Sequence, residues 1–187
     1  MSGLLVIISG PSGVGKDTII DRLLSQNPEQ FCYSISATTR APRGNEVNGK
    51  DYFFINDMEF LTMINENKFL EWAEYNDNFY GTPLNYVKIM IAQDKVILTE
   101  IEVKGALEIM SKDIRKLSIF LMPPDKDELL NRLQKRSTDD EDSIKKRLEI
   151  AGWEMQQSHN FDEIVVNDEI DATVSKISQI IHNILNI

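Results

Sequence analysis

Short runs of apolar residues recur along the chain, and segments with helical spacing separate them. The clearest runs lie at residues 4–8, 96–101 and 117–122, and a shorter run lies at 164–166. Unbroken runs of leucine and β-branched residues are typical of strands that are buried on both faces of a parallel sheet. The pattern therefore predicts that these segments are strands.

Helical spacing marks most of the segments between the runs. In the last of them, Val174, Ile177, Ile181 and Ile184 form one apolar stripe, which predicts packing against the core. Alternating strands and helices favour an α/β fold whose parallel sheet is covered on both faces. The predicted helices are residues 17–26, 57–67, 84–92, 106–112, 125–134, 143–157 and 171–185.

Residues 33–82 interrupt this alternation with strand and turn signals. Residues 31–38 alternate in character, and the pair Asn48-Gly49 is typical of a tight turn. Further short strands are predicted at residues 52–55, 69–75 and 78–81. We predict a single domain of residues 1–187, in which this small β-rich insert interrupts a core of residues 1–32, 83–123 and 154–187.

A glycine-rich segment joins the first predicted strand to the first predicted helix. Its glycines at positions 10, 13 and 15 let successive backbone N–H groups point at one anion, and the helix adds its positive end. Lys16 supplies a mobile cation. A plain glycine-rich turn with a surface lysine is the alternative, but the spacing of Gly10, Gly15 and Lys16 favours a phosphate-binding loop, or P-loop.

Asp17 stands where this motif usually has a serine or threonine, and Thr18 follows it. Three readings remain open: Asp17 faces solvent while Thr18 contacts phosphate, Asp17 helps to hold hydrated Mg²⁺, or it stabilises the first turn of the helix.

Composition narrows the setting of the protein. The formal net charge of −10 over 187 residues argues against a general binder of nucleic acids or anionic membranes, which would be basic. Cys32 is the only cysteine, which excludes an internal disulfide and favours a reducing, cytoplasmic setting. The apolar run at residues 4–8 is too short to span a bilayer.

Several motifs together resemble the guanylate kinase family, whose members transfer a phosphoryl group from ATP to GMP. The longest is Ser-x-Thr-Thr-Arg-x-Pro-Arg-x-x-Glu-x-x-Gly-x-Asp-Tyr at residues 36–52, and further matches lie at residues 69–72, 80–81 and 165–168. The resemblance covers nearly the whole chain. It implies a P-loop kinase core, a nucleotide-binding insert at residues 33–82 and a helical lid at residues 124–153.

The resemblance implies a guanine site whose residue types suit that base. Glu71 would accept hydrogen bonds from N1 and N2 of guanine, and Glu102 would add an acceptor near the 2-amino group. Hydroxyls of Ser36 and Thr82 would donate to O6. The phosphate of GMP would be held by two arginine forks and two phenolic hydroxyls, those of Arg40, Arg43, Tyr52 and Tyr80. Each residue taken alone would more often have an ordinary surface or core-edge role, and it is their joint occurrence in this order that favours the site.

The resemblance also assigns residues to ATP and to its metal ion. Lys16 and the lid arginines Arg132, Arg136 and Arg147 would be catalytic, and Asn167 would lie near the adenine. Magnesium would be held by Thr18 and Glu100, either directly or through water. The remaining residues expected to contact ATP are those of the loop, Gly10, Pro11, Ser12, Gly13, Val14, Gly15, Asp17 and Thr18.

The implied reaction is direct in-line transfer from Mg·ATP to GMP or dGMP, giving ADP and GDP in purine nucleotide metabolism. A kinase for another nucleoside monophosphate is one rival, and a non-catalytic binding module is another. The intact Lys16, Arg40 and Arg43 favour an enzyme over a module. A GTP-hydrolysing switch lacks support, since the chain has no Asn-Lys-x-Asp motif.

Overall fold

The computed structural model describes residues 3–125, 127–130 and 141–186; for residues 141–143 it describes the backbone but not the side chains. Two of the predicted lid arginines, Arg132 and Arg136, and part of the predicted helix at 125–134 lie outside the described residues. Among the described residues, no helix is long and apolar enough to cross a membrane.

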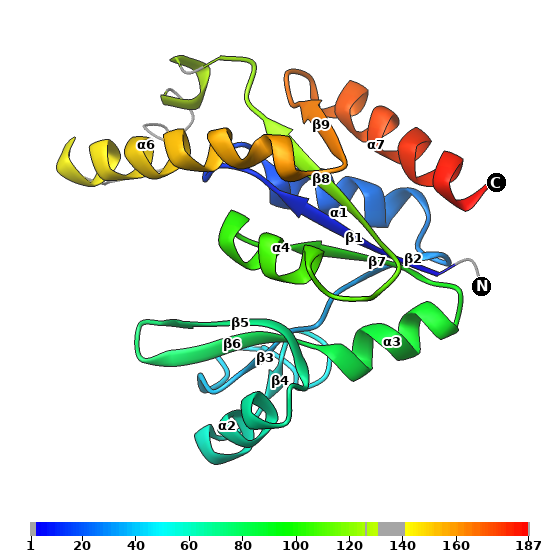
Figure 1. The fold of residues 1–187 in the computed structure, drawn as a ribbon, viewed down its shortest axis with the longest axis vertical. Coiled ribbons are helices and arrows are strands. Elements are labelled where there is room, and N and C mark those ends of the chain that lie inside the picture. The colour runs from blue at the N-terminus through cyan, green and yellow to red at the C-terminus, as the bar shows by residue number, and fades with distance from the viewer. Residues whose placement is uncertain (1–2, 126, 131–140, 187) are drawn as a thin grey trace.

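A five-stranded parallel sheet forms the centre of the molecule (Figure 1). Its strand order is β2-β7-β1-β8-β9, and every neighbouring pair is parallel. All six residues of β1 are buried, which explains why its sequence is an unbroken apolar run. The strands are β1 (Leu4–Ser9), β2 (Phe31–Tyr33), β7 (Val96–Glu100), β8 (Lys116–Met122) and β9 (Glu163–Val166).

Helices cover both faces of this sheet, as the alternation of strands and helices predicts. Val6 packs with buried residues of α1 and α7, while its neighbour Ile7 packs on the opposite face with α3 and α4. The helices are α1 (Lys16–Gln26), α3 (Leu84–Ala92), α4 (Val103–Met110) and α7 (Ile170–Leu185). A further helix, α6 (Glu141–Gln156), follows the last undescribed internal segment and is succeeded by the 3₁₀ turn η1 (Gln157–Asn160).

A second, four-stranded sheet lies below the parallel one in Figure 1, in the order β4-β3-β6-β5. Its small core is aromatic, and the rings of Phe60 and Phe69 stack with centroids 4.4 Å apart. Its elements are β3 (Ala37–Thr38), β4 (Phe53–Phe54), helix α2 (Asp57–Asn65), β5 (Phe69–Tyr75) and β6 (Asn78–Pro83). The division of the chain into a core, an insert at residues 33–82 and a lid at residues 124–153 stays a prediction.

Three local expectations differ from the structure. The alternating stretch at residues 31–38 is divided between the two sheets, with β2 in the parallel sheet and β3 in the second. The helix predicted at 106–112 begins at Val103, because Val103 is buried and Glu102 already occupies the N-cap position. On α7, Ile184 is 38% exposed and Leu185 completes the buried stripe instead.

Candidate active site

The turn between β1 and α1 has the curled backbone that a phosphate loop needs. Gly10, Gly13 and Gly15 all have positive φ angles, of 145°, 84° and 98°. A side chain at Gly10 would also place its Cβ 2.4 Å from the carbonyl oxygen of Leu121, so this position requires glycine. The curled loop thus leads into the N-terminus of α1. The positive end of the helix dipole favours a bound anion there.

Lys16 is the first residue of α1, and its side chain folds back over the loop. Its Nζ donates to the carbonyl oxygens of Gly10, at 2.9 Å, and of Pro11, at 3.3 Å. The same nitrogen lies 3.8 Å from Oε1 of Glu100 at the end of β7. The amine is therefore already inside the loop, at the position where a phosphate would need it.

The other two residues of the first helical turn differ in exposure. Asp17 is exposed and lines the cavity beside the loop, whereas Thr18 is half-buried. Because Asp17 lies in the first turn of α1, its charge also suits the positive end of that helix.

Asn167 supports the loop from the end of β9. Its side chain is buried, and its Nδ2 donates to the carbonyl oxygen of Val14 over 2.7 Å. A Cβ on Gly15 would lie 2.9 Å from the same Nδ2. The structure therefore gives Asn167 a contact with the loop, and its predicted contact with adenine stays a prediction.

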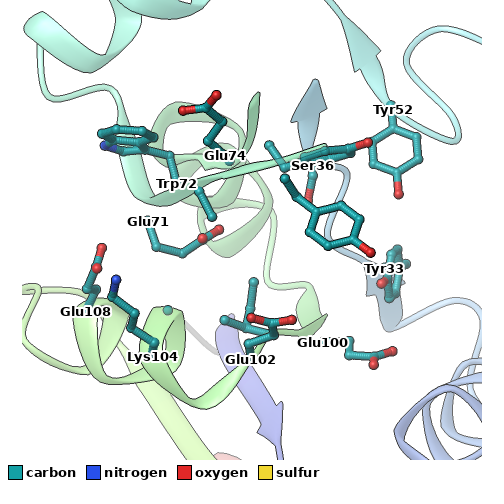
Figure 2. A pocket seen from close by; sticks show the side chains of 16 residues that line it. Tyr33, Ser36, Tyr52, Glu71, Trp72, Glu74, Glu100, Glu102, Lys104 and Glu108 are labelled. Atoms are coloured by element: carbon teal, nitrogen blue, oxygen red, sulfur yellow. The ribbon is translucent and has the colours of Figure 1, made fainter. Parts of the chain in front are cut away.

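A second cavity of about 650 Å³ lies between the two sheets (Figure 2). Carboxylates dominate the ionisable groups around it, with Lys104 as the cation among its lining residues. Five of the residues predicted to bind GMP line this cavity: Ser36, Tyr52, Glu71, Tyr80 and Glu102. The segments 36–52, 71–80 and 100–108, which are far apart in the chain, thus meet around one space.

Glu71 on β5 is the buried acid of this cavity, with 9% of its surface exposed. Thr82 Oγ1 on the neighbouring strand β6 donates to Glu71 Oε1 over 2.6 Å. Burial raises the pKa of the Glu71 carboxyl, and the Thr82 hydrogen bond opposes that rise. Gly105 leaves room for this acid, since a Cβ there would lie 3.3 Å from Glu71 Oε2.

This geometry changes the expected role of Thr82. The side chain is buried, and its single hydroxyl proton is used by Glu71. Thr82 therefore orients the acid in this structure rather than presenting a donor to a base. The Ser36 side chain does line the cavity, as expected.

Arg40 is held in place by Glu46, a residue of the long motif for which no role is predicted. Two parallel hydrogen bonds of 2.9 Å join its guanidinium nitrogens to the two carboxylate oxygens of Glu46. The guanidinium carbon lies 5.4 Å from the ring centroid of Tyr52. The hydrogen bonds to Glu46 raise the pKa of Arg40 and lower the pKa of Glu46, so both groups stay charged.

Arg43 contributes differently. Its backbone N–H donates to Glu46 Oε2 over 2.7 Å, while its side chain is exposed in the same loop. Within the predicted phosphate cradle, the Arg40 guanidinium lies over the ring of Tyr52, and the centroids of the Tyr52 and Tyr80 rings are 6.2 Å apart. Phosphate binding by these residues stays a prediction.

A cavity of about 480 Å³ beside the phosphate loop adjoins the larger one. Four side chains line both cavities, those of Tyr33, Tyr52, Glu100 and Glu102. Glu100 and Glu102 project from the end of β7 and from the turn that follows it (Figure 2). Groups bound in the two cavities would meet at these four side chains.

Helix α6 closes the loop cavity from the other side. Arg147 Nη2, the one predicted lid arginine within the described residues, donates to Ser12 Oγ over 2.8 Å. Glu154, about two turns further along α6, also lines this cavity. Sequence reasoning missed Glu154 and Tyr33, because the fold alone brings them to the loop cavity. It also missed Glu46, which bonds to Arg40 within the same loop and whose place in the motif could have indicated it.

Comparison with a family model and with known proteins relates the chain to one family. A model of the guanylate kinase family matches residues 2–184. A guanylate kinase of Mycoplasmoides gallisepticum is 46% identical over 179 residues, covering 96% of this chain and 92% of that protein. A guanylate kinase of Bacillus subtilis is also 46% identical over 179 residues, covering 96% of this chain and 88% of that protein.

A solved structure is similar as well. The crystal structure of guanylate kinase from Anaplasma phagocytophilum superposes with a TM-score of 0.71 at 32% identity. The similarity covers 97% of this chain and 85% of that one.

Proposed function

The chain belongs to the guanylate kinase family and phosphorylates GMP with ATP, and from this premise we propose how its residues share the reaction. The smaller cavity receives the phosphates of ATP, and the larger one receives GMP. The two substrates approach each other beside Glu100 and Glu102, which line both spaces.

On the donor side, the loop backbone and Lys16 bind the phosphates of ATP. The Lys16 amine exchanges its carbonyl partners for phosphate oxygens, since it already lies over the loop. Arg147 reaches the same place from α6 through Ser12. Arg132 and Arg136 are proposed to join it, on the resemblance to the family alone.

On the acceptor side, Glu71 selects the base. Guanine offers two adjacent N–H donors at N1 and N2, and a carboxylate can accept both, whereas adenine offers no such pair. Thr82 and Gly105 fix the position of this carboxylate. Arg40, oriented by Glu46, binds the phosphate of GMP together with Tyr52 and Tyr80.

Magnesium fits this site as a companion of ATP. Glu100 offers a carboxylate at the junction, and Thr18 offers a hydroxyl in the first turn of α1. Among the described residues, no group of three or more His, Cys, Asp or Glu side chains could hold a metal by itself. The ion would therefore take its other ligands from phosphate and water, and it would offset charge on the transferring group.

The reaction itself requires positioning and charge stabilisation rather than a protein nucleophile. Arg40 and the two tyrosines hold the phosphate oxygen of GMP in line with the terminal phosphate of ATP. Lys16 and Arg147 stabilise the negative charge that spreads over the transferring group. Closure of α6 over the loop excludes water, which would otherwise compete as acceptor. The free thiol of Cys32 fits the proposed cytoplasmic location.

One observation carries this assignment: the buried, hydroxyl-bound carboxylate of Glu71 faces a cavity that adjoins the phosphate loop. Glu71→Gln tests it, because glutamine keeps the size of the side chain but places an N–H donor opposite one of the guanine N–H donors. We expect kcat/KM for GMP to fall roughly 10²- to 10⁴-fold, with ATP binding retained.

A coupled assay with ATP and GMP, dGMP, AMP, CMP or UMP measures this directly. Glu59→Gln is the matched control, since Glu59 is an exposed acid on α2 of the same small sheet domain. An unchanged preference for GMP in Glu71→Gln, with the control at wild-type level, would remove Glu71 from the base site.

A further inference from the structure

Glu154 is a carboxyl group inside the phosphate cavity that the reaction above does not use. It projects from α6, only 8% of its surface is exposed, and it lines the cavity beside the loop. Burial raises the pKa of its carboxyl, and the backbone N–H of Ser12, within the phosphate loop, lowers that pKa by a smaller amount. An acid thus lies beside the loop that must receive the phosphates of ATP.

The charged surroundings of Glu154 are mostly negative. From the other elements, the carboxylates of Asp17, Glu100 and Glu102 line the same cavity, with the phenols of Tyr33 and Tyr52. Lys16 is the only cation among the described residues that line it, and its amine also lies 3.8 Å from Glu100. Arg147, on the same helix as Glu154, donates to the side chain of Ser12.

A bound triphosphate would add several negative charges to this space. An ionised Glu154 would then lie beside phosphate oxygens in a site with little water, which is unfavourable. A neutral carboxylic acid avoids this cost. Its carbonyl oxygen can accept a hydrogen bond from the Ser12 N–H, and its O–H can donate to a phosphate oxygen.

We propose that Glu154 is a protonated phosphate ligand in the complex with MgATP, so that binding of MgATP takes up one proton from the solvent at this residue. The inference rests on the proposed location of ATP at the loop. Burial, with a smaller opposing effect of Lys16, raises the pKa of Glu154 to about 7 in the ligand-free protein. The group is therefore partly ionised near neutrality, and a proton remains to be bound.

The sign of the pH dependence follows from linkage. The bound state holds more protons than the free state above the pKa of Glu154, so affinity for MgATP falls as pH rises beyond that value. Glu154→Gln mimics the protonated acid at every pH. Titration of the nucleotide itself affects both proteins equally, so it does not change the ratio of the wild-type and Glu154→Gln dissociation constants.

Isothermal titration calorimetry with MgATP and no GMP, between about pH 6 and pH 9, tests the proposal. We expect wild-type and Glu154→Gln proteins to bind within about twofold of each other near pH 6, and the wild type to weaken roughly tenfold per pH unit above 7 relative to the variant. In two buffers of different ionisation enthalpy near pH 8, the wild type should take up close to one more proton than the variant.

Glu149→Gln is the matched control, because Glu149 is an exposed acid on the same helix, and it should behave as the wild type. A constant ratio of dissociation constants, or no proton uptake by the wild type near pH 8, would overturn the proposal. If the Glu154→Gln protein does not fold, the number of protons that the wild type takes up on binding MgATP near pH 8 still tests the proposal. Failure of the folded wild type to bind MgATP at any pH would instead overturn the location of the ATP site.

Discussion

At the residue scale, the proposed selectivity for guanine depends on one buried acid, Glu71, whose surroundings are fixed. Glu71 has lost most of its contact with water, and Thr82 holds one of its oxygens. A site of this kind rejects a base that leaves the carboxylate without its donors, because an unpaired buried polar group costs about 1–3 kcal/mol. On this proposal, the site is specific for guanine because another base would leave the buried carboxylate without hydrogen-bond donors.

The raised pKa of Glu71 predicts a pH dependence of base recognition. The carboxylate is the form that accepts two guanine donors, so affinity is present above the Glu71 pKa and is lost as pH falls through it. We expect affinity to decrease about tenfold per pH unit below that pKa. Guanosine is the suitable probe, because it lacks the phosphate that would titrate in the same range.

The measurement is an NMR or calorimetric titration of the wild type with guanosine as pH is lowered. Glu71→Gln serves as the comparison, and its weak binding should not vary with pH. Parallel pH profiles for the two proteins would contradict the assignment of the acceptor to this carboxylate.

At the element scale, the loop between β3 and β4 acts as a rigid clamp. The two 2.9 Å hydrogen bonds from Arg40 to Glu46, and the ring of Tyr52 beneath, fix the plane of the guanidinium. Three of its five N–H donors are used by Glu46 and the Ala41 carbonyl, and a guanidinium held in one plane can present the remaining donors to a phosphate at small entropic cost. Glu46 is therefore expected to act on GMP through Arg40.

Glu46→Gln is predicted to raise KM for GMP roughly tenfold, because a loosely held clamp meets the phosphate in fewer productive geometries. Guanosine affinity should stay within about twofold of wild type, since the nucleoside has no phosphate for Arg40 to bind. Lys50→Gln controls for loss of charge in the same loop, where Lys50 is exposed. Equal losses for GMP and guanosine would show that Glu46 supports the fold rather than the clamp.

The end of β9 and the phosphate loop form the second coupled pair of elements. Asn167→Ala removes the 2.7 Å hydrogen bond to the carbonyl oxygen of Val14. We predict a decrease in the free energy of unfolding of about 1–3 kcal/mol and weaker MgATP binding. Denaturant titration and calorimetry measure the two effects, with Asn183→Ala on the exposed side of α7 as control. Normal MgATP affinity in Asn167→Ala would show that the contact does not shape the loop.

At the scale of the whole molecule, the sequence predicts the parallel sheet and its covering helices well. The run of β1 is uninterrupted from Leu4 to Ile8, and that of β8 is broken only by the buried Ser118, because both strands are buried on both faces; this signal is local. The start of α4 was missed by three residues, because burial of Val103 depends on where α4 packs. The division of residues 31–38 between two sheets likewise depends on tertiary pairing.

The same distinction holds for the site. Residues within a motif, such as Lys16 and Arg40, are predictable because their chemistry and spacing lie together in the chain. The bond of Arg40 to Glu46 forms within one loop, and the donor to Glu71 comes from the neighbouring strand of one hairpin, so both pairs are close in the chain. Their side-chain geometry is nevertheless visible only in the folded structure. The position of Glu154 beside the phosphate loop depends on how α6 packs, and no local pattern predicts it.

The central claim is that two adjoining cavities place a guanine base on Glu71 and the phosphates of ATP on the loop at residues 10–16. A crystal structure of the protein with GMP and MgADP tests it most directly. The account predicts the N1 and N2 edge of GMP within hydrogen-bond distance of Glu71, its phosphate beside Arg40, and the β-phosphate of ADP beside Lys16. A base bound away from Glu71, or a GMP phosphate that points away from the loop cavity, would contradict it.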